Sequence, residues 1–303
     1  MSTPVARPDA CEAETVRHET RIPLPRPFDA AGVLAWMGPR AVAGVEEVTA
    51  TSFARTMRLP SGPAWSVVTV VEGALLIEAE VADEADGGEL ERRVRLLFDV
   101  ATDPVCVDAA LSAIPEIAPL VARTPGIRVP GAADPFEMLV RAMVGQQISV
   151  AAARTHLTRL AEALGERVRI AGRERTLFPT ARALADRGSE VLRGPQSRVR
   201  AIVEAARAVA DGELVLDAQT PRASLLALRG VGPWTADYLA MRVGRHPDVI
   251  LTGDLALRAG AAAVGLPSSP AELLAWSAVA APWRSYLSSH LWRAALPAPK
   301  GSS

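Results

Sequence analysis

Two patterns of hydrophobic positions divide the chain near residue 105. Between Glu46 and Val81, short runs rich in β-branched residues alternate with glycine-containing breaks, a pattern that predicts an antiparallel meander. The expected strands cover residues 48–57, 65–71 and 74–81, and helices are expected at 30–37 and 90–99. Together these elements predict an N-terminal antiparallel α/β domain over residues 21–105.

Residues 106–297 follow a helical period almost throughout, with short Gly/Pro breaks. Helices are expected at 134–145, 150–164, 197–210, 221–228, 233–243, 255–264, 270–278 and 283–295. Arg187-Gly188 and Gly194-Pro195 are expected to bound connections. Residues 1–20 lack apolar periodicity and are expected to form a disordered extension, with 298–303 as a tail. The predicted fold class is therefore α+β.

The composition argues against several kinds of site and reaction. The net charge of −1 argues against a protein that coats nucleic acid through bulk positive charge, so any DNA contact has to come from local geometry. Cys11 and Cys106 are too few for a disulfide framework or a four-cysteine zinc or iron–sulfur site. The single lysine, Lys300, leaves little basis for Schiff-base chemistry. A polar N-terminus and the lack of an apolar run of about 18 residues favour a cytoplasmic protein without membrane contact. A monomer is expected.

The segment 225–239 predicts two helices joined by a tight turn at Gly230-Val231-Gly232. Pro233 suits the first position of the second helix, and Val231 is an apolar peg between the two helices. Glycines let a phosphate approach closely, and amides at a helix start can donate to it. The alternative is an ordinary helical hairpin whose glycines serve only the turn.

Asp254 follows a Thr-Gly turn and directly precedes a predicted helix. It can act as an N-cap, and a capped carboxylate is also a fixed one, so the structural and the chemical interpretation are compatible. Two other acids compete for the same role. Asp237 falls on the second hairpin helix and Asp248 precedes an apolar run, so both are expected to be structural.

Aromatic residues make up 4% of the chain, yet six of them fall within its last 70 residues. Trp234 and Tyr238 are spaced i, i+4 and share a helix face. Trp276 and Trp283 are expected to pack in the core. His290 and the other histidines lack metal-ligand spacing and are expected to be structural.

The hairpin, together with segments 124–131, 134–150 and 281–292, resembles the helix-hairpin-helix DNA glycosylase superfamily. Within it, the chain is most similar to the AlkA-type 3-methyladenine DNA glycosylase II, from about residue 22 to 296. The resemblance implies an N-terminal antiparallel α/β domain followed by a two-part all-helical domain, with a cleft between the two helical parts. It identifies Asp254 as the catalytic carboxylate and places Trp234, Tyr238 and Trp292 in the base pocket.

The resemblance also implies the reaction. Breaking an N-glycosidic bond builds positive charge on the sugar, which a carboxylate stabilises. A cationic base such as 3-methyladenine or 7-methylguanine leaves as a neutral molecule, so one carboxylate suffices. Bifunctional relatives carry a lysine two positions after the second hairpin glycine, where this chain has Trp234. We therefore expect base excision from double-stranded DNA without strand cleavage.

Further site assignments rest on the same resemblance. It implies DNA contacts at Gly230, Val231, Gly232 and Thr235. It also implies a structural Na⁺ or K⁺ on the main-chain carbonyls of Leu226, Leu228 and Val231. No other cofactor and no iron–sulfur cluster is expected.

Two positions depart from the family pattern. Gln147 stands where a leucine wedge is usual, and we expect it to fill the gap that a flipped base leaves. Arg229 stands where proline is common. Three alternatives remain: a glycosylase for deaminated bases (hypoxanthine, uracil), a non-catalytic DNA-binding protein, and a fused methyl-transfer sensor. The last is disfavoured because residues 1–20 supply only Cys11.

Overall fold

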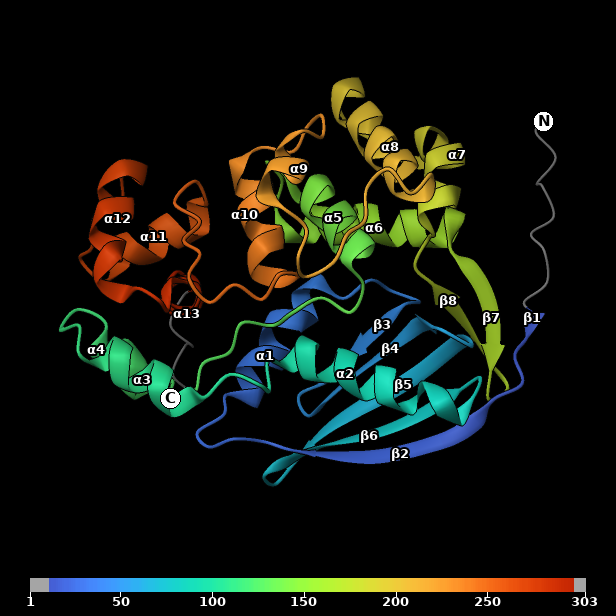
Figure 1. The fold of residues 1–303 in the computed structure, drawn as a ribbon, viewed down its shortest axis with the longest axis horizontal. Coiled ribbons are helices and arrows are strands. Elements are labelled where there is room, and N and C mark those ends of the chain that lie inside the picture. The colour runs from blue at the N-terminus through green and yellow to red at the C-terminus, as the bar shows by residue number, and fades with distance from the viewer. Residues whose placement is uncertain (1–10, 297–303) are drawn as a thin grey trace, which may run out of the picture.

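The structure is a computed structural model that describes residues 11–296. Its N-terminal part is a five-stranded antiparallel sheet in the order β2-β6-β5-β4-β3 (Figure 1). The strands are β2 Val16–Pro23, β3 Glu46–Val48, β4 Ser52–Leu59, β5 Gly62–Val71 and β6 Ala74–Val81. Helices α1 (Ala30–Met37) and α2 (Gly87–Phe98) pack against this sheet in one apolar core. The predicted meander and both helices are present, but the single strand expected at 48–57 is two strands, β3 and β4, separated by residues 49–51.

The expectation that residues 11–20 form a loose extension is wrong; residues 1–10 lie outside the described part of the chain. Strand β2 pairs with β6 along its whole length, from Val16 opposite Val81 to Pro23 opposite Ala74. It is an edge strand in which only Ile22 is buried, so its sequence has little hydrophobic alternation. Strand β1 (Cys11–Glu12) pairs in parallel with β7 (Glu166–Ile170).

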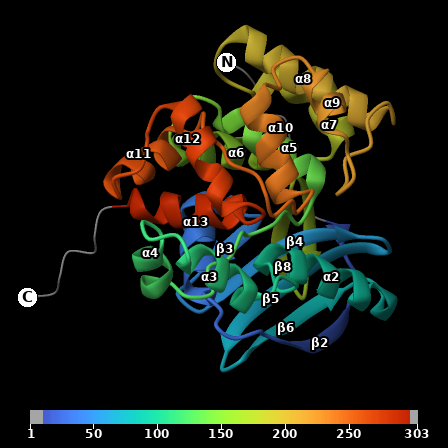
Figure 2. The same ribbon diagram turned by 60° about the vertical axis from the view of Figure 1, so that its left-hand side comes forward.

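The rest of the described chain is mostly helical, in two groups with separate cores (Figure 2). The helices of the first group are α5 Pro135–Gly145, α6 Val150–Leu164, α7 Ala181–Val191, α8 Gln196–Ala210, α9 Arg222–Leu226 and α10 Pro233–Arg242. Those of the second are α3 Pro104–Ser112, α4 Ala118–Arg123, α11 Leu255–Ala263, α12 Pro270–Trp276 and α13 Arg284–Ala294. Tyr238 on α10 packs against both cores, so α10 lies at their junction.

Several elements of the helical region differ from the prediction, since no helix was expected at α3, α4 or α7. Residues 187–188 are not a connection: Gly188 is buried inside α7, where an added Cβ would lie 3.2 Å from Val203 on α8. Glycine at this position lets the two helices pack closely. Strands β7 and β8 (Arg173–Leu177) form a hairpin whose charged residues obscure its β pattern. This hairpin contacts the large sheet, where Thr56 Oγ1 donates to the Thr176 carbonyl at 2.7 Å.

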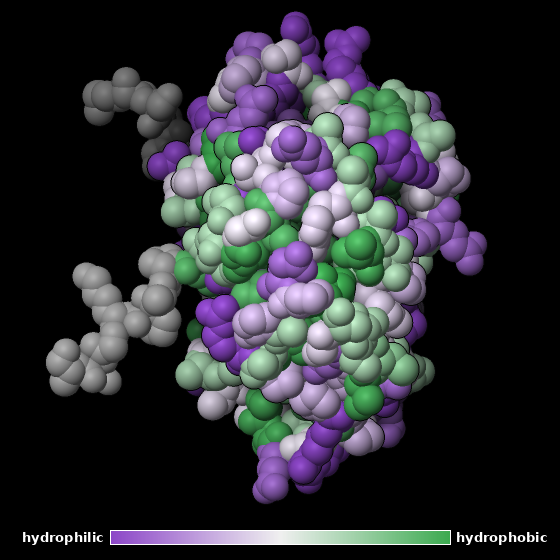
Figure 3. Space-filling view, turned by 90° about the vertical axis from the view of Figure 1, so that its left-hand side faces the viewer, coloured by the Kyte–Doolittle hydropathy of each residue, from purple (hydrophilic) through white to green (hydrophobic). Residues whose placement is uncertain are grey.

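No helix in residues 11–296 is long and apolar enough to span a bilayer. On the face shown in Figure 3, hydrophobic and hydrophilic residues are interspersed.

Candidate active site

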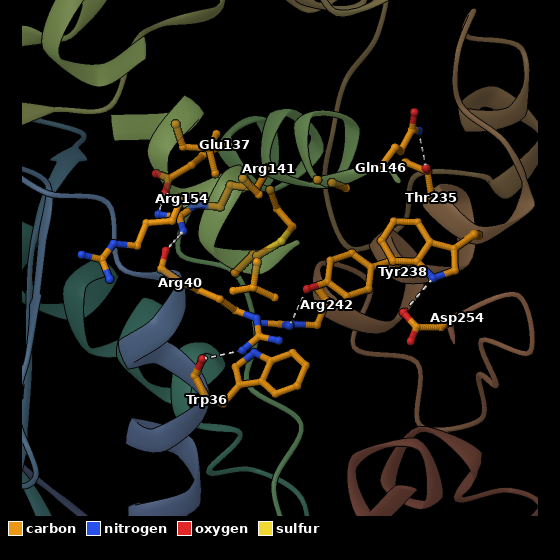
Figure 4. A pocket seen from close by; sticks show the side chains of 18 of the residues that line it. Trp36, Arg40, Glu137, Arg141, Gln146, Arg154, Thr235, Tyr238, Arg242 and Asp254 are labelled. Carbon is orange, nitrogen blue, oxygen red and sulfur yellow. Dashed lines mark hydrogen bonds and ion pairs between the residues drawn. The ribbon is translucent and has the colours of Figure 1, made fainter. Parts of the chain in front are cut away.

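A cleft of about 1080 Å³ opens where the two helical groups meet the N-terminal domain. It is lined by residues from α1, α5, α10 and α13, by the turn after α5, and by the hairpin before α10. Figure 4 shows Asp254 and Trp36 on opposite sides of the Tyr238 ring. The cleft therefore brings together residues that are distant in sequence.

Asp254 is the N-cap of α11, and its carboxylate accepts three hydrogen bonds. The Leu257 amide donates to Oδ1 at 2.9 Å, and the Trp292 indole Nε1 donates to the same oxygen at 3.2 Å. The Trp234 indole Nε1 donates to Oδ2 at 3.2 Å. All three donors are neutral, so they hold the carboxylate in place without cancelling its charge.

Asp237 and Asp248, the two alternatives to Asp254 as the catalytic acid, each form an ion pair. Asp237 forms an ion pair with Arg222 at 2.5 Å, and Asp248 forms one with Arg284 at 2.6 Å. The Arg284 hydrogen bonds lower the pKa of Asp248. Neither acid lines the cleft, which supports the prediction that both are structural.

Of the aromatic residues that line the cleft, four form two pairs. Trp234 and Tyr238 stack with centroids 5.1 Å apart and planes 9° apart. Trp36 and Trp292 lie 5.0 Å apart at 39°. Trp36 was not predicted, because it comes from α1 of the N-terminal domain, nearly 200 residues before Trp234 in the sequence.

The aromatics expected in the core lie there. Trp276 and Trp283 pack against the core of the α11–α13 group. His290 is buried in α13, and this burial, reinforced by Arg293, lowers its pKa to about 3. It is a neutral, structural histidine at physiological pH.

Arginines that the sequence did not single out also line the cleft, among them Arg40 and Arg242. The Arg40 guanidinium carbon lies 3.5 Å from the centroid of the Trp36 ring, and its Nη1 donates to the Trp36 carbonyl at 2.9 Å. Arg242 is buried and donates from Nη1 to the Tyr238 hydroxyl at 2.7 Å. Burial lowers the pKa of Arg40 to about 10, so this group remains charged at neutral pH. Burial also lowers the pKa of Arg242.

A closed ring of four ion pairs forms another part of the wall of the cleft. Arg55 contacts Glu46 at 3.2 Å and Glu137 at 2.7 Å, while Arg141 contacts Glu46 at 2.7 Å and Glu137 at 2.6 Å. Burial alone would raise the pKa of Glu137, but Arg55 and Arg141 outweigh it and lower that pKa. The ring joins the N-terminal domain to α5, and Arg141 also donates to the Arg40 carbonyl at 3.1 Å.

The two hairpin glycines differ in backbone conformation and in the space around them. Gly230 has φ +77°, and an added Cβ would lie 2.7 Å from the Ala201 side chain. Gly232 is extended, at φ −95° and ψ −179°, and an added Cβ would meet no atom within 4 Å. Of the two, only Gly230 therefore uses the left-handed conformation that the sequence allowed for both. Val231 is buried in the core of the α5–α10 group, as its predicted peg role requires.

The start of α10 presents free backbone donors. The amides of Gly232, Trp234 and Thr235 donate to no residue in the described part of the chain. The Thr235 side chain is only 1% exposed, and its hydroxyl accepts from Gln146 Nε2 at 2.9 Å. Any contact of Thr235 with DNA would therefore use its amide and not its hydroxyl.

Gln146 also fixes the neighbouring turn. Its Nε2 donates to the Gly230 carbonyl at 2.9 Å, which ties the turn after α5 to the hairpin. Gln147 is exposed in that turn, at φ +59°, and lines the cleft. This places the predicted wedge residue at the cleft, next to the hairpin.

The carbonyls predicted to hold a monovalent cation lie in the hairpin. The Leu228 carbonyl accepts from the Val231 amide at 3.2 Å, while the Val231 carbonyl accepts no hydrogen bond from residues 11–296. This free carbonyl suits a cation ligand, and the cation site stays a prediction.

Comparisons with known proteins decide the family. Residues 19–134 match the AlkA N-terminal domain. The DNA-3-methyladenine glycosylase 2 of Escherichia coli (strain K12) is 30% identical over 275 residues, covering 88% of this chain and 94% of that protein. The chain belongs to the AlkA family.

A second AlkA relative is longer than this chain. The probable bifunctional transcriptional activator/DNA repair enzyme AlkA of Mycobacterium tuberculosis (strain ATCC 25618 / H37Rv) is 38% identical over 292 residues. The match covers 95% of this chain but 59% of that relative's length.

Solved structures agree on the AlkA fold. The 3-methyladenine DNA glycosylase from Archaeoglobus fulgidus superposes with a TM-score of 0.78 at 17% identity, covering 90% of this chain and 97% of that chain. MBOgg1 in complex with a low-affinity DNA ligand gives a TM-score of 0.70 at 16% identity, covering 93% and 98%. The predicted family and the α+β fold class are thus confirmed.

Proposed function

We propose that this AlkA-family chain is a monofunctional DNA glycosylase that hydrolyses the N-glycosidic bond of alkylated purines in double-stranded DNA. The observation that carries the proposal is the Asp254 carboxylate, held by three neutral donors at the edge of an aromatic cleft. The AlkA relatives named as DNA-3-methyladenine glycosylases support it.

The chemistry follows from this arrangement. A nucleotide flipped out of the duplex would present its sugar to Asp254 and its base to the aromatic rings. As the C1′–N bond breaks, positive charge builds on the sugar, and the carboxylate stabilises it. Water then supplies a hydroxyl to C1′ and releases its other proton to solvent. A cationic alkylated purine takes the bonding electron pair and departs neutral.

The same site supports a reaction that stops at the abasic site. Where a lyase would place a lysine amine, this chain has the Trp234 indole, which is hydrogen-bonded to Asp254. Lys300 lies outside the described residues. Strand cleavage through a Schiff base would therefore lack an amine in the cleft.

The proposal is tested by base release from methylated duplex DNA. We expect the parent to release 3-methyladenine and 7-methylguanine and to leave the strands uncut. Asp254→Asn should slow release by about 10²- to 10³-fold, because it removes the charge and keeps the side-chain shape. Near-parental release by Asp254→Asn, or a covalent enzyme–DNA adduct trapped by borohydride, would contradict the assignment.

DNA binding would depend on the hairpin backbone, because the net charge is close to zero. Gly232→Ala adds a methyl group in open space without backbone strain, next to the free amides of α10. We expect it to weaken binding to undamaged and abasic duplexes equally, because phosphate contacts carry no sequence information.

Gln147→Ala is the comparison variant for Gly232→Ala. It should weaken binding to the abasic duplex more than to undamaged duplex, because only the former has a gap to fill. Both variants are titrated at one salt concentration. Parental binding by Gly232→Ala would mean that the hairpin is only a turn.

A further inference from the structure

The Gln146 side chain joins two parts of the cleft wall that are distant in the sequence. Its Nε2 donates to the Gly230 carbonyl at 2.9 Å and to the Thr235 hydroxyl at 2.9 Å, and Figure 4 shows the second of these bonds. Because a carbonyl can only accept, the amide nitrogen and not the amide oxygen faces Gly230. Both hydrogens of this nitrogen therefore have an acceptor, one in the hairpin and one on α10.

On the hairpin side, the two acceptors of Gln146 flank the free backbone donors. The amides of Gly232, Trp234 and Thr235 fall within the segment that begins at Gly230, and they donate to no residue in the described part of the chain. Gly232 has open space around it, since no atom lies within 4 Å of the position of an added Cβ. The bonds from Gln146 therefore help to hold the amides that a phosphate would occupy.

On the other side of Gln146, the backbone does little to hold the turn that carries Gln147. The Ile148 amide donates to the Gly145 carbonyl at 3.5 Å, which is longer than the usual limit of about 3.2 Å. Within the described part of the chain, the backbone of this turn forms no other hydrogen bond with backbone groups. Gln147 has φ +59°, which a residue with a side chain seldom adopts. The two bonds of the Gln146 side chain therefore supply much of the hydrogen bonding that fixes this turn.

We propose that Gln146 is a positioning residue that couples the hairpin to the wedge residue Gln147. A phosphate bound by the amides at the start of α10 would hold that helix start in place, and through Gln146 it would hold Gln147 in the conformation that enters the duplex. This inference rests on the proposed glycosylase function and adds a route by which contact with the DNA backbone favours base flipping. Gln146 acts here through Gln147 and not on the flipped base.

Thr235 allows the coupling to be tested from the hairpin side. Its side chain is only 1% exposed, so its hydroxyl is not accessible to DNA and can affect binding only through Gln146. Thr235→Val removes this hydroxyl acceptor, while the shape of the side chain and the backbone amide remain. An effect of Thr235→Val on the wedge would therefore be indirect, and it should depend on the presence of Gln146.

The test measures the Kd of each variant for an undamaged and for an abasic duplex at one salt concentration, and the ratio of the two is the preference for the gap. Because both values come from the same protein preparation, a loss of folded protein cancels in the ratio. Gln146→Met keeps the side-chain length and removes the donors. We expect the preference to fall about 10-fold in Gln146→Met, which loses two hydrogen bonds, and about 2- to 5-fold in Thr235→Val, which loses one.

Double variants separate coupling from independent effects. In the Gln146→Met background, Gln147→Ala should lower the preference by less than about 2-fold further, because the wedge is already released from the hairpin. Thr235→Val should likewise add little in that background. Gln219→Met is the control: it removes the same kind of amide from an exposed loop before α9, outside the cleft, and should leave the preference at the parental value.

A parental preference in Gln146→Met would overturn the proposal. Full additivity of Gln146→Met and Gln147→Ala would overturn it as well, because the two side chains would then act independently. The same holds for equal weakening toward both duplexes, which would make Gln146 a support of the hairpin alone, and for a parent that does not prefer the abasic duplex. Base release by the parent tests the glycosylase function separately, so that function can stand when this inference falls.

Discussion

Glu137 and Asp254 are carboxylates that line the same cleft, but their surroundings differ. Glu137 lies between Arg55 and Arg141 in a buried ring of ion pairs. Asp254 accepts from two indoles and one amide, all neutral. A guanidinium partner neutralises a carboxylate and fixes it as part of the structure, whereas neutral donors leave its charge available. From the type of partner we therefore expect Glu137 to be structural, and we propose Asp254 as the reactive acid.

The largest expected effect is on stability, at Glu137. Glu137→Gln removes one of two negative charges from the ring and leaves Arg55 and Arg141 sharing Glu46. We expect the free energy of unfolding to drop by about 3–5 kcal/mol, as is typical when one partner of a buried pair is removed. Denaturant unfolding measures it.

The matched control for Glu137 is Glu190, whose ion pair with Arg187 is exposed. Glu190→Gln should change the free energy of unfolding by less than about 1 kcal/mol. Equal losses in the two variants would mean that the buried ring contributes no more than a surface ion pair.

These residues also show which parts of the site can be predicted from the sequence. The hairpin, the helix capped by Asp254, and the i, i+4 pair Trp234 and Tyr238 have local patterns, and the structure places them together at the cleft. Trp36 and Arg40 have no such pattern, because they reach the site only through packing of the N-terminal domain against α5 and α10. Their spacing of four residues at the end of a helix was the one available signal.

A smaller effect is expected at Trp234, on rate. Trp234→Phe keeps a ring to stack on Tyr238 but removes the indole donor to Asp254 Oδ2. With one of three donors lost, the carboxylate becomes less fixed, and base release should slow about tenfold. Trp276→Phe, in the core of the α11–α13 group, is the control and should change the rate less. Equal slowing in both variants would assign the effect to packing.

The smallest expected effect is on the stability of Asp254→Asn. Asparagine caps a helix about as well as aspartate, so the amide of Leu257 keeps its acceptor and the favourable start of α11 remains. One indole loses its acceptor, and the helix dipole loses a negative charge, which together should lower the free energy of unfolding by no more than about 1 kcal/mol. The same denaturant titration used for Glu137→Gln measures it. If Asp254→Asn instead loses as much stability as Glu137→Gln, Asp254 is a structural carboxylate like Glu137. A small loss of stability together with a large loss of base release is the combination expected of a reactive carboxylate.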